Sequence, residues 1–265
     1  MNETFGAMLL GAVQGLTEFL PVSSSGHLVL FQQFLPVPGD PVAFDLVLHL
    51  GTLMPVFWVY RASLLEIIRD FVGGEGGWLE RKGVRLGAWV VVGSVPTAAI
   101  GLAFEDLFTH LFANTLSVGI AFFVTAALLY GTRFAPGGDT DESSMKWWHA
   151  VLIGVVQGLA ITPGISRSGS TIALALFLGM NREYAARFSF LLSIPAILGA
   201  FLLKASDLTV TGAALPPLVG GFIAAAAVGY VALVVLIRLV KSGDFSRFAW
   251  YLIGVGILSI GLALG

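Results

Sequence analysis

The fold is decided by two stretches of sequence, GAVQGLTEFLPVSSSG at residues 11–26 and GVVQGLAITPGISRSG at residues 154–169. Aligned without gaps at an offset of 143, they carry the same residue at eight of sixteen positions. Apolar composition explains a matching Val or Leu, but it does not explain the shared Gln-Gly and Ser-x-Ser-Gly pairs. We therefore interpret the two stretches as copies of one segment, and the chain as an internal duplication.

The composition of the chain indicates a membrane protein. Hydrophobic residues make up 57% of the 265 residues, charged residues make up only 11%, and the mean hydropathy is +0.90. A soluble domain carries about 25% charged residues. The absence of cysteine excludes disulfides and thiolate metal sites. The net charge of -2 leaves no basic surface for nucleic acid.

Three apolar stretches follow each copy of the segment. A spanning helix needs about 20 mostly apolar residues, and six stretches approach that length: 44–60, 86–104, 115–131, 188–203, 213–237 and 248–264. The segments 5–34 and 147–178 are instead interrupted by polar residues, which is typical of a re-entrant hairpin. We expect an all-α polytopic membrane protein of two inverted-topology repeats, each a re-entrant helical hairpin followed by three transmembrane helices. The expected divisions are a first repeat at 1–134, a linker at 135–146 and a second repeat at 147–265.

The charges of the polar loops predict an orientation. If each hairpin re-enters the side from which it came, the loops at 61–85, 133–147, 179–187 and 238–247 share one face. That face then holds every Lys and Arg except Lys204, on the opposite face, and Arg167, inside the second hairpin. Hairpins that crossed fully would divide the same charges almost evenly. Cytoplasmic loops collect Lys and Arg, so we expect re-entrant hairpins that meet near the midplane of the membrane. Both termini would lie on the outer side.

Gln14 and Glu18 are the first candidate site residues. Their i,i+4 spacing places them on one helix face, near the C-terminal end of the entering helix, where the dipole favours a cation. A carboxylate, an amide oxygen and a nearby hydroxyl suit a hard cation such as Mg²⁺ or Ca²⁺. The alternative is that Glu18 pairs with Arg167 and only holds the hairpins together. Carboxylates inside a membrane are costly and usually functional, which favours a metal or catalytic role.

The two hairpin tips have the features of an anion site. Pro21 ends the entering helix, and a serine can cap the returning one, so that free N–H groups and hydroxyls gather at one point. The second tip repeats the arrangement and adds Arg167, whose guanidinium suits a phosphate. The apolar surroundings indicate that the anion is attached to a lipid. The substrate-binding candidates are Ser23, Ser25, Gly26, Ser166, Ser168, Gly169, Ser170 and Thr171.

The tips and the Gln-x-x-x-Glu pair resemble the motifs of the undecaprenyl-diphosphate phosphatase family (BacA/UppP). The matching runs are Pro-Val-Ser-Ser-Ser-Gly-His at 21–27 and Pro-Gly-Ile-Ser-Arg-Ser-Gly-Ser-Thr at 163–171. The length and span pattern of that family cover the whole chain. The resemblance implies a membrane phosphatase that hydrolyses undecaprenyl diphosphate to undecaprenyl phosphate and inorganic phosphate, and so recycles the carrier lipid of cell-wall synthesis. It also implies a divalent cation, Mg²⁺ or Ca²⁺, and a multi-pass protein of the bacterial inner (plasma) membrane, with its site and both termini on the outer, periplasmic side.

The resemblance also implies roles for individual residues. Gln14 and Glu18 become the cation or acid–base pair, Ser24 the nucleophile, His27 the motif histidine, and Arg167 the residue that holds the diphosphate. Some members of the family have Glu where this chain has Gln14. Because an amide cannot act as a base, we assign that duty to Glu18 or His27.

Several alternatives remain open from the sequence. Water could attack phosphorus directly, with Ser24 only binding phosphate, or His27 could be the nucleophile. His49 is left without a role and is interpreted as a core histidine. A rival function is that of a transporter or flippase, because carriers also use inverted repeats with broken helices. The expected partners are a polyprenyl diphosphate lipid and the bilayer, with a second copy of the chain as a further candidate and no nucleic acid.

Overall fold

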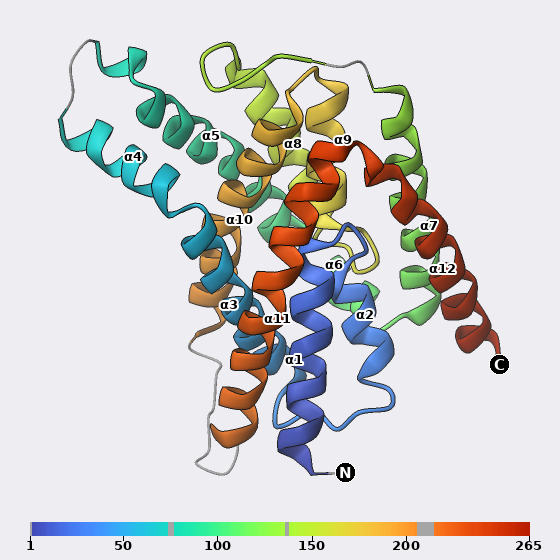
Figure 1. Cartoon of the computed structure of the whole chain (residues 1–265). Coiled ribbons are helices and arrows are strands. Elements are labelled where there is room, and N and C mark those ends of the chain that lie inside the picture. The colour runs from blue at the N-terminus through green and yellow to red at the C-terminus, as the bar shows by residue number, and fades with distance from the viewer. Residues whose placement is uncertain (1, 74–76, 136–137, 206–214) are drawn as a thin grey trace.

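The chain folds as a bundle of helices (Figure 1), seen in a computed structural model that describes residues 2–73, 77–135, 138–205 and 215–265. Over these ranges the only β contact is an isolated bridge between Thr140 and Met180. The expected all-α class is confirmed.

Six of the helices in the described ranges are long and apolar enough to cross a membrane. They are α3 (Pro41–Val59), α5 (Lys82–Ala103), α7 (Thr115–Gly131), α10 (Arg182–Lys204), α11 (Leu215–Ser242) and α12 (Phe248–Leu264). Each overlaps one apolar stretch predicted from the sequence, which confirms a polytopic membrane protein. The helix ends differ from the predicted ends by a few residues, and residues 213–214 of the fifth predicted span lie outside the described ranges.

Two further helix pairs form the hairpins. The first consists of α1 (Glu3–Phe19) and α2 (Ser24–Phe31), and the second of α8 (Trp147–Leu159) and α9 (Arg167–Phe177). In Figure 1, α1 enters the bundle from the end where both termini lie, whereas α8 enters from the opposite end. The tips therefore point toward each other in the middle of the bundle. The division into repeats at 1–134 and 147–265 stays a prediction, and residues 136–137 of the linker lie outside the described ranges.

The segment 61–85 is not the simple polar loop that the sequence analysis expected. Most of its first half forms α4 (Arg61–Val72), and η1 (Trp78–Glu80) follows. The physical reason is an amphipathic pattern, in which pairs of apolar residues at 64–65, 67–68 and 71–72 recur at helical spacing. Three more short helices connect the spans: α6 (Glu105–Phe112), η2 (Thr132–Phe134) and η4 (Asp244–Arg247).

The duplicated glycines position the two hairpins. On α1, a Cβ added to Gly11 would lie 2.2 Å from the carbonyl oxygen of Gly221 on α11. On α8, a Cβ added to Gly154, the matching position, would lie 2.0 Å from the carbonyl oxygen of Gly93 on α5. Small residues allow membrane helices to approach this closely. Each entering helix therefore packs against the second long helix of the opposite half of the chain.

Candidate active site

The two hairpin tips touch each other inside the bundle. Ser23 caps α2, and its Oγ accepts the backbone N–H of Gly164 from the second tip at 3.1 Å. A Cβ added to Gly26 would lie 3.0 Å from the Cα of Gly164, so the two backbones are in close contact. The second tip is held by Thr125 of α7, whose Oγ1 donates to the Gly164 carbonyl at 3.0 Å and accepts the Ser166 N–H at 3.0 Å. The sequence prediction that the tips meet agrees with these contacts.

An ion pair joins the two hairpins at this point. Arg167, at the start of α9, donates from Nη2 to Oε1 of Glu18, near the end of α1. The side chain of Glu18 is 6% exposed and that of Arg167 is 16% exposed. Neither charge could be buried alone without a large desolvation cost. The ion pair that the sequence analysis considered as an alternative is therefore present.

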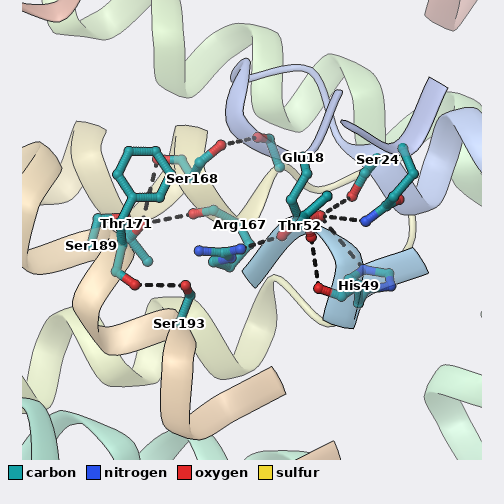
Figure 2. A network of polar contacts seen from close by, with 12 residues as sticks. Glu18, Ser24, His49, Thr52, Arg167, Ser168, Thr171, Ser189 and Ser193 are labelled. Atoms are coloured by element: carbon teal, nitrogen blue, oxygen red, sulfur yellow. Dashed lines mark hydrogen bonds and ion pairs between the residues drawn. The ribbon is translucent and has the colours of Figure 1, made fainter. Parts of the chain in front are cut away.

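The second oxygen of Glu18 contacts a different set of groups. Oε2 accepts a hydrogen bond from Ser24 Oγ at 2.6 Å and another from Gln14 Nε2 at 3.0 Å. Nε2 of His49 lies 3.5 Å from the same oxygen. Figure 2 shows Arg167 on one side of the carboxylate and Ser24 with His49 on the other. A serine hydroxyl held 2.6 Å from a carboxylate is an arrangement that can activate a nucleophile.

Three buried polar atoms around this pair have no hydrogen-bond partner within the described part of the chain. They are Nη1 of Arg167, Oγ of Ser170 and Oε1 of Gln14. Buried polar atoms are nearly always paired, so each unpaired one needs an explanation. The arginine and serine atoms can donate to an anion, and the glutamine oxygen can accept from a donor or bind a cation.

The predicted metal ligands fit a divalent cation in part. No group of three or more His, Cys, Asp or Glu that could hold a metal occurs among the residues described. Gln14 and Glu18 would supply one free amide oxygen and a carboxylate that is already shared with Arg167 and Ser24. Mg²⁺ is commonly held by one or two protein oxygens together with substrate phosphates and water. The donor set therefore suits a cation bound jointly with a phosphorylated ligand.

Most hydroxyls of the second tip are occupied by structural hydrogen bonds. Ser166 caps α9, since its Oγ accepts the Gly169 N–H at 3.0 Å, and it also contacts Ser168 Oγ at 3.4 Å. Thr171 Oγ1 donates to the Arg167 carbonyl at 2.8 Å and lies 2.5 Å from Ser189 Oγ. Of the predicted substrate-binding hydroxyls in this tip, only that of Ser170 has no such partner.

In the first tip, too, the polar groups of Ser23 and His27 are occupied by hydrogen bonds within the protein. Ser23 Oγ accepts the Gly26 N–H at 3.4 Å and lies 3.3 Å from Ser25 Oγ. His27 is buried beside this turn, but its ring nitrogens are hydrogen-bonded to groups other than Glu18 and Arg167. Its Nδ1 lies 2.8 Å from the Ser23 carbonyl and its Nε2 lies 2.7 Å from the hydroxyl of Tyr251 on α12.

Two residues near the tips received no role from the sequence. His49 lies one turn along α3 from Asp45, whose carbonyl its Nδ1 contacts at 2.8 Å, and it faces Glu18. A titratable residue inside a predicted membrane span is itself a sign of a functional site. On that ground His49 could have been predicted as a site residue from the sequence. Tyr251 comes from the last helix and carries no local motif, so only the three-dimensional structure reveals its contact with His27.

Comparison with known proteins agrees with the motifs. A family model described as bacitracin resistance protein BacA matches residues 7–258. An undecaprenyl-diphosphatase of Desulfosudis oleivorans is 46% identical over 272 residues, covering 99% of each chain. One of Alkaliphilus metalliredigens is 45% identical over 268 residues, covering 97% of this chain and 98% of its own. One of Methanosphaera stadtmanae is 41% identical over 275 residues, covering 100% of this chain and 99% of its own. The resemblance seen in the two motifs is confirmed, and the chain belongs to the bacitracin resistance protein BacA family.

Proposed function

We propose that this protein hydrolyses undecaprenyl diphosphate to undecaprenyl phosphate and inorganic phosphate, and so recycles the carrier lipid of cell-wall synthesis. The observation that carries the proposal is the buried cluster between the hairpin tips. There, Glu18 accepts a hydrogen bond from Ser24, and Arg167 keeps one N–H group free. An ion pair that only joined two hairpins would require neither the serine nor the free guanidinium nitrogen.

The diphosphate would bind between the tips. Arg167 Nη1 and Ser170 Oγ are unpaired donors on the first turn of α9, where the helix dipole also favours an anion. Positive charge and oriented donors stabilise the charge that builds on a transferred phosphoryl group. The polyprenyl tail would remain in the bilayer beside the long helices.

Ser24 is the proposed nucleophile. Its Oγ would attack the terminal phosphorus, the bond from that phosphorus to the bridging oxygen would break, and undecaprenyl phosphate would leave. The hydroxyl proton would pass to Oε2 of Glu18, which already accepts the hydrogen bond at 2.6 Å. Water would then attack the phosphoserine and release phosphate. Direct attack by water uses the same residues, so the proposed reaction does not depend on the covalent route.

His27 is not assigned the role of nucleophile or base in this proposal. Both of its ring nitrogens are within hydrogen-bond distance of other groups, the Ser23 carbonyl and the Tyr251 hydroxyl. Glu18 is therefore the base that the geometry favours.

A divalent cation, Mg²⁺ or Ca²⁺, is proposed as the cofactor. Gln14 through its free Oε1 and Glu18 through its carboxylate would hold it together with the substrate. When bound, it would supply positive charge that neutralises the phosphate oxygens.

We place the protein in the bacterial inner membrane with both termini and the opening of the site on the periplasmic side. The support is the charge asymmetry of the loops, since every Lys and Arg except Lys204 and Arg167 lies on the other face in this arrangement. A periplasmic opening would let the site meet the diphosphate that cell-wall synthesis releases on that side.

Phosphate release from a polyprenyl diphosphate by purified protein in detergent tests the function. The wild type is expected to release phosphate with Mg²⁺ or Ca²⁺ and to stop when a chelator is added. Glu18→Gln removes the base and also leaves Arg167 without its counter-charge, so the variant must first be shown to be folded by its thermal unfolding midpoint; its kcat should then be lower by about 100-fold or more. The matched control is Ser94→Ala, which removes a hydroxyl bonded only to the Val90 carbonyl on α5.

The same assay separates the proposal from its rivals. Ser24→Ala should abolish turnover if the serine is phosphorylated, whereas persistent turnover would reject that route and favour attack by water. A wild type that releases no phosphate with either cation would reject the phosphatase. The transporter or flippase would then be tested by movement of the lipid across liposomes, because a carrier needs Arg167 but has no use for the hydrogen bond between Ser24 and Glu18.

A further inference from the structure

Ser23 has an unusual backbone conformation beside the proposed nucleophile. Its φ is 67° and its ψ is 97°, and it is the one non-glycine residue with a positive φ among those that the structure describes. Side chains rarely adopt this region, and such residues persist only where their surroundings hold them. Strained residues of this kind cluster at functional sites. The next residue along the chain is Ser24.

Hydrogen bonds hold Ser23 at its side-chain hydroxyl and at its backbone carbonyl. Its Oγ accepts the N–H of Gly164, which fixes it to the second hairpin at 3.1 Å, and the N–H of Gly26 at 3.4 Å. Its carbonyl oxygen accepts the N–H of His27 at 3.2 Å and contacts Nδ1 of the same residue at 2.8 Å. The turn is therefore fixed at the side chain and at the carbonyl at once.

His27 connects this turn to the last helix of the chain. A carbonyl oxygen can only accept a hydrogen bond, so Nδ1 must carry the proton. In the neutral ring Nε2 then accepts, and its partner is the hydroxyl of Tyr251 at 2.7 Å. The ring is also enclosed by Tyr251, stacked at an interplanar angle of 6°, and by the edge of Phe122 at a centroid distance of 5.4 Å. His27 has no free nitrogen for chemistry, but it is well held for positioning.

We infer that Ser23 is a positioning residue whose strained backbone aims Ser24 Oγ at Glu18. The hydrogen-bonded chain Gly164–Ser23–His27–Tyr251, which we call the clamp, holds that backbone in place, and Tyr251 is its far end. The inference rests on the proposed phosphatase activity and deepens it. It replaces a substrate-binding role for Ser23 and a catalytic role for His27 with structural ones. Tyr251 acts on the reaction only through its hydrogen bond to His27.

Two substitutions of Ser23 separate positioning from substrate contact. Glycine adopts a positive φ without strain, so Ser23→Gly loses the hydroxyl but keeps the turn. Ser23→Ala loses the hydroxyl and keeps the Cβ, and its backbone is expected to relax and move Ser24. We expect kcat for phosphate release to fall about tenfold in Ser23→Gly and about 100-fold in Ser23→Ala, with KM nearly unchanged in both. Equal losses, or a larger loss with glycine, would mean that the hydroxyl itself serves the substrate and would overturn the inference.

Tyr251→Phe tests the far end of the clamp and keeps the stacked ring. We expect about fivefold lower kcat at unchanged KM in the wild-type background, and less than about twofold in the Ser23→Gly background, because glycine needs no clamp. Tyr130→Phe is the matched control, since Tyr130 makes only ring contacts with Phe134, Trp250 and Arg133. Equal effects of Tyr251→Phe in both backgrounds, or none in either, would overturn the role of Tyr251.

Wild-type activity in the same assay distinguishes failure of the positioning role from failure of the proposed function. Release by the wild type with equal losses in the two Ser23 variants rejects the positioning role alone. A wild type without release rejects the proposed function and, with it, the reaction that the clamp would serve.

Discussion

Arg167 and Glu18 show how one contact can serve both folding and chemistry. The guanidinium satisfies the carboxylate through Nη2, yet leaves Nη1 buried and unpaired. Removing either partner would strand the other charge, which costs about 3–5 kcal/mol in buried pairs. An alanine substitution would therefore damage the fold and the reaction together. A substitution that keeps the charge is more informative.

Arg167→Lys is the sharper test at this position. The ammonium can still pair with Glu18, but it lacks the planar fork that points a second N–H toward a ligand. Loss of one charge-assisted hydrogen bond of about 1.5–3 kcal/mol should lower kcat/KM for phosphate release about 10- to 100-fold. The thermal unfolding midpoint without substrate should change little. Full activity in Arg167→Lys would show that Nη1 does not bind the phosphate.

The sequence predicted part of this site, and the limits have a physical cause. Glu18, Ser24 and Arg167 lie within two short motifs, so chain connectivity alone places them at the hairpin tips, and the structure brings them together. His49 and Tyr251 reach the same region from α3 and α12, which only tertiary packing places there. The sequence also does not tell which hydroxyls are used up by helix caps, as that of Ser166 is.

At the scale of the helices, close approach at the duplicated glycines sets the depth of each hairpin. Gly11 and Gly154 contact carbonyl oxygens of the facing helices, where no side chain could be added without movement of a backbone. A change in either contact would shift a hairpin tip. The proposed site would then lose its alignment although no residue within it had changed.

Gly11→Ala is expected to destabilise the protein. The added methyl group would meet the Gly221 carbonyl oxygen at 2.2 Å, and overpacking of this kind costs about 1–3 kcal/mol. Thermal unfolding in detergent should show a lower midpoint. The control is Gly254→Ala on α12, where an added Cβ meets no atom within 4 Å. Equal midpoints for the two variants would contradict the role given to the α1–α11 contact.

The helices were more predictable from sequence than their connections. All six long helices overlap predicted apolar stretches, because length and hydropathy decide whether a segment can cross a bilayer. The helix α4 was missed, because its apolar residues alternate with charged ones at 61, 66, 69 and 70 and the segment reads as polar when averaged. The pairing of each hairpin with the opposite half cannot be read from either segment alone.

At the scale of the whole molecule, the two ends of the bundle differ in charge. The helix α4, residues 138–146 of the linker and η4 between α11 and α12 lie at the end opposite the two termini (Figure 1). In the sequence, the segments 61–85, 133–147 and 238–247 carry ten of the 14 Lys and Arg residues. The proposed orientation therefore places this end in the cytoplasm.

Single cysteines can test the orientation cleanly, because the natural chain contains none. Asp106→Cys, exposed on α6, should react with a membrane-impermeant maleimide in intact spheroplasts of the expressing cells. Ser143→Cys, exposed in the linker, should react only after the membrane is opened. The reverse pattern would invert the proposed topology, and labelling of both in intact spheroplasts would contradict any single orientation.

The reciprocal packing of the hairpins has a consequence for biosynthesis. The helix α1, which is synthesised before α11, finds its main partner in that helix, which begins at Leu215. Until that helix is made, Gly11 and Gly15 lack the backbone surface against which they pack. The helix α1 must therefore wait, loosely inserted or held by the insertion machinery, while the helices between it and α11 are translated. Maturation of this protein is then a single late event, and a chain truncated before α11 would be a substrate for quality-control proteases rather than a half-active enzyme.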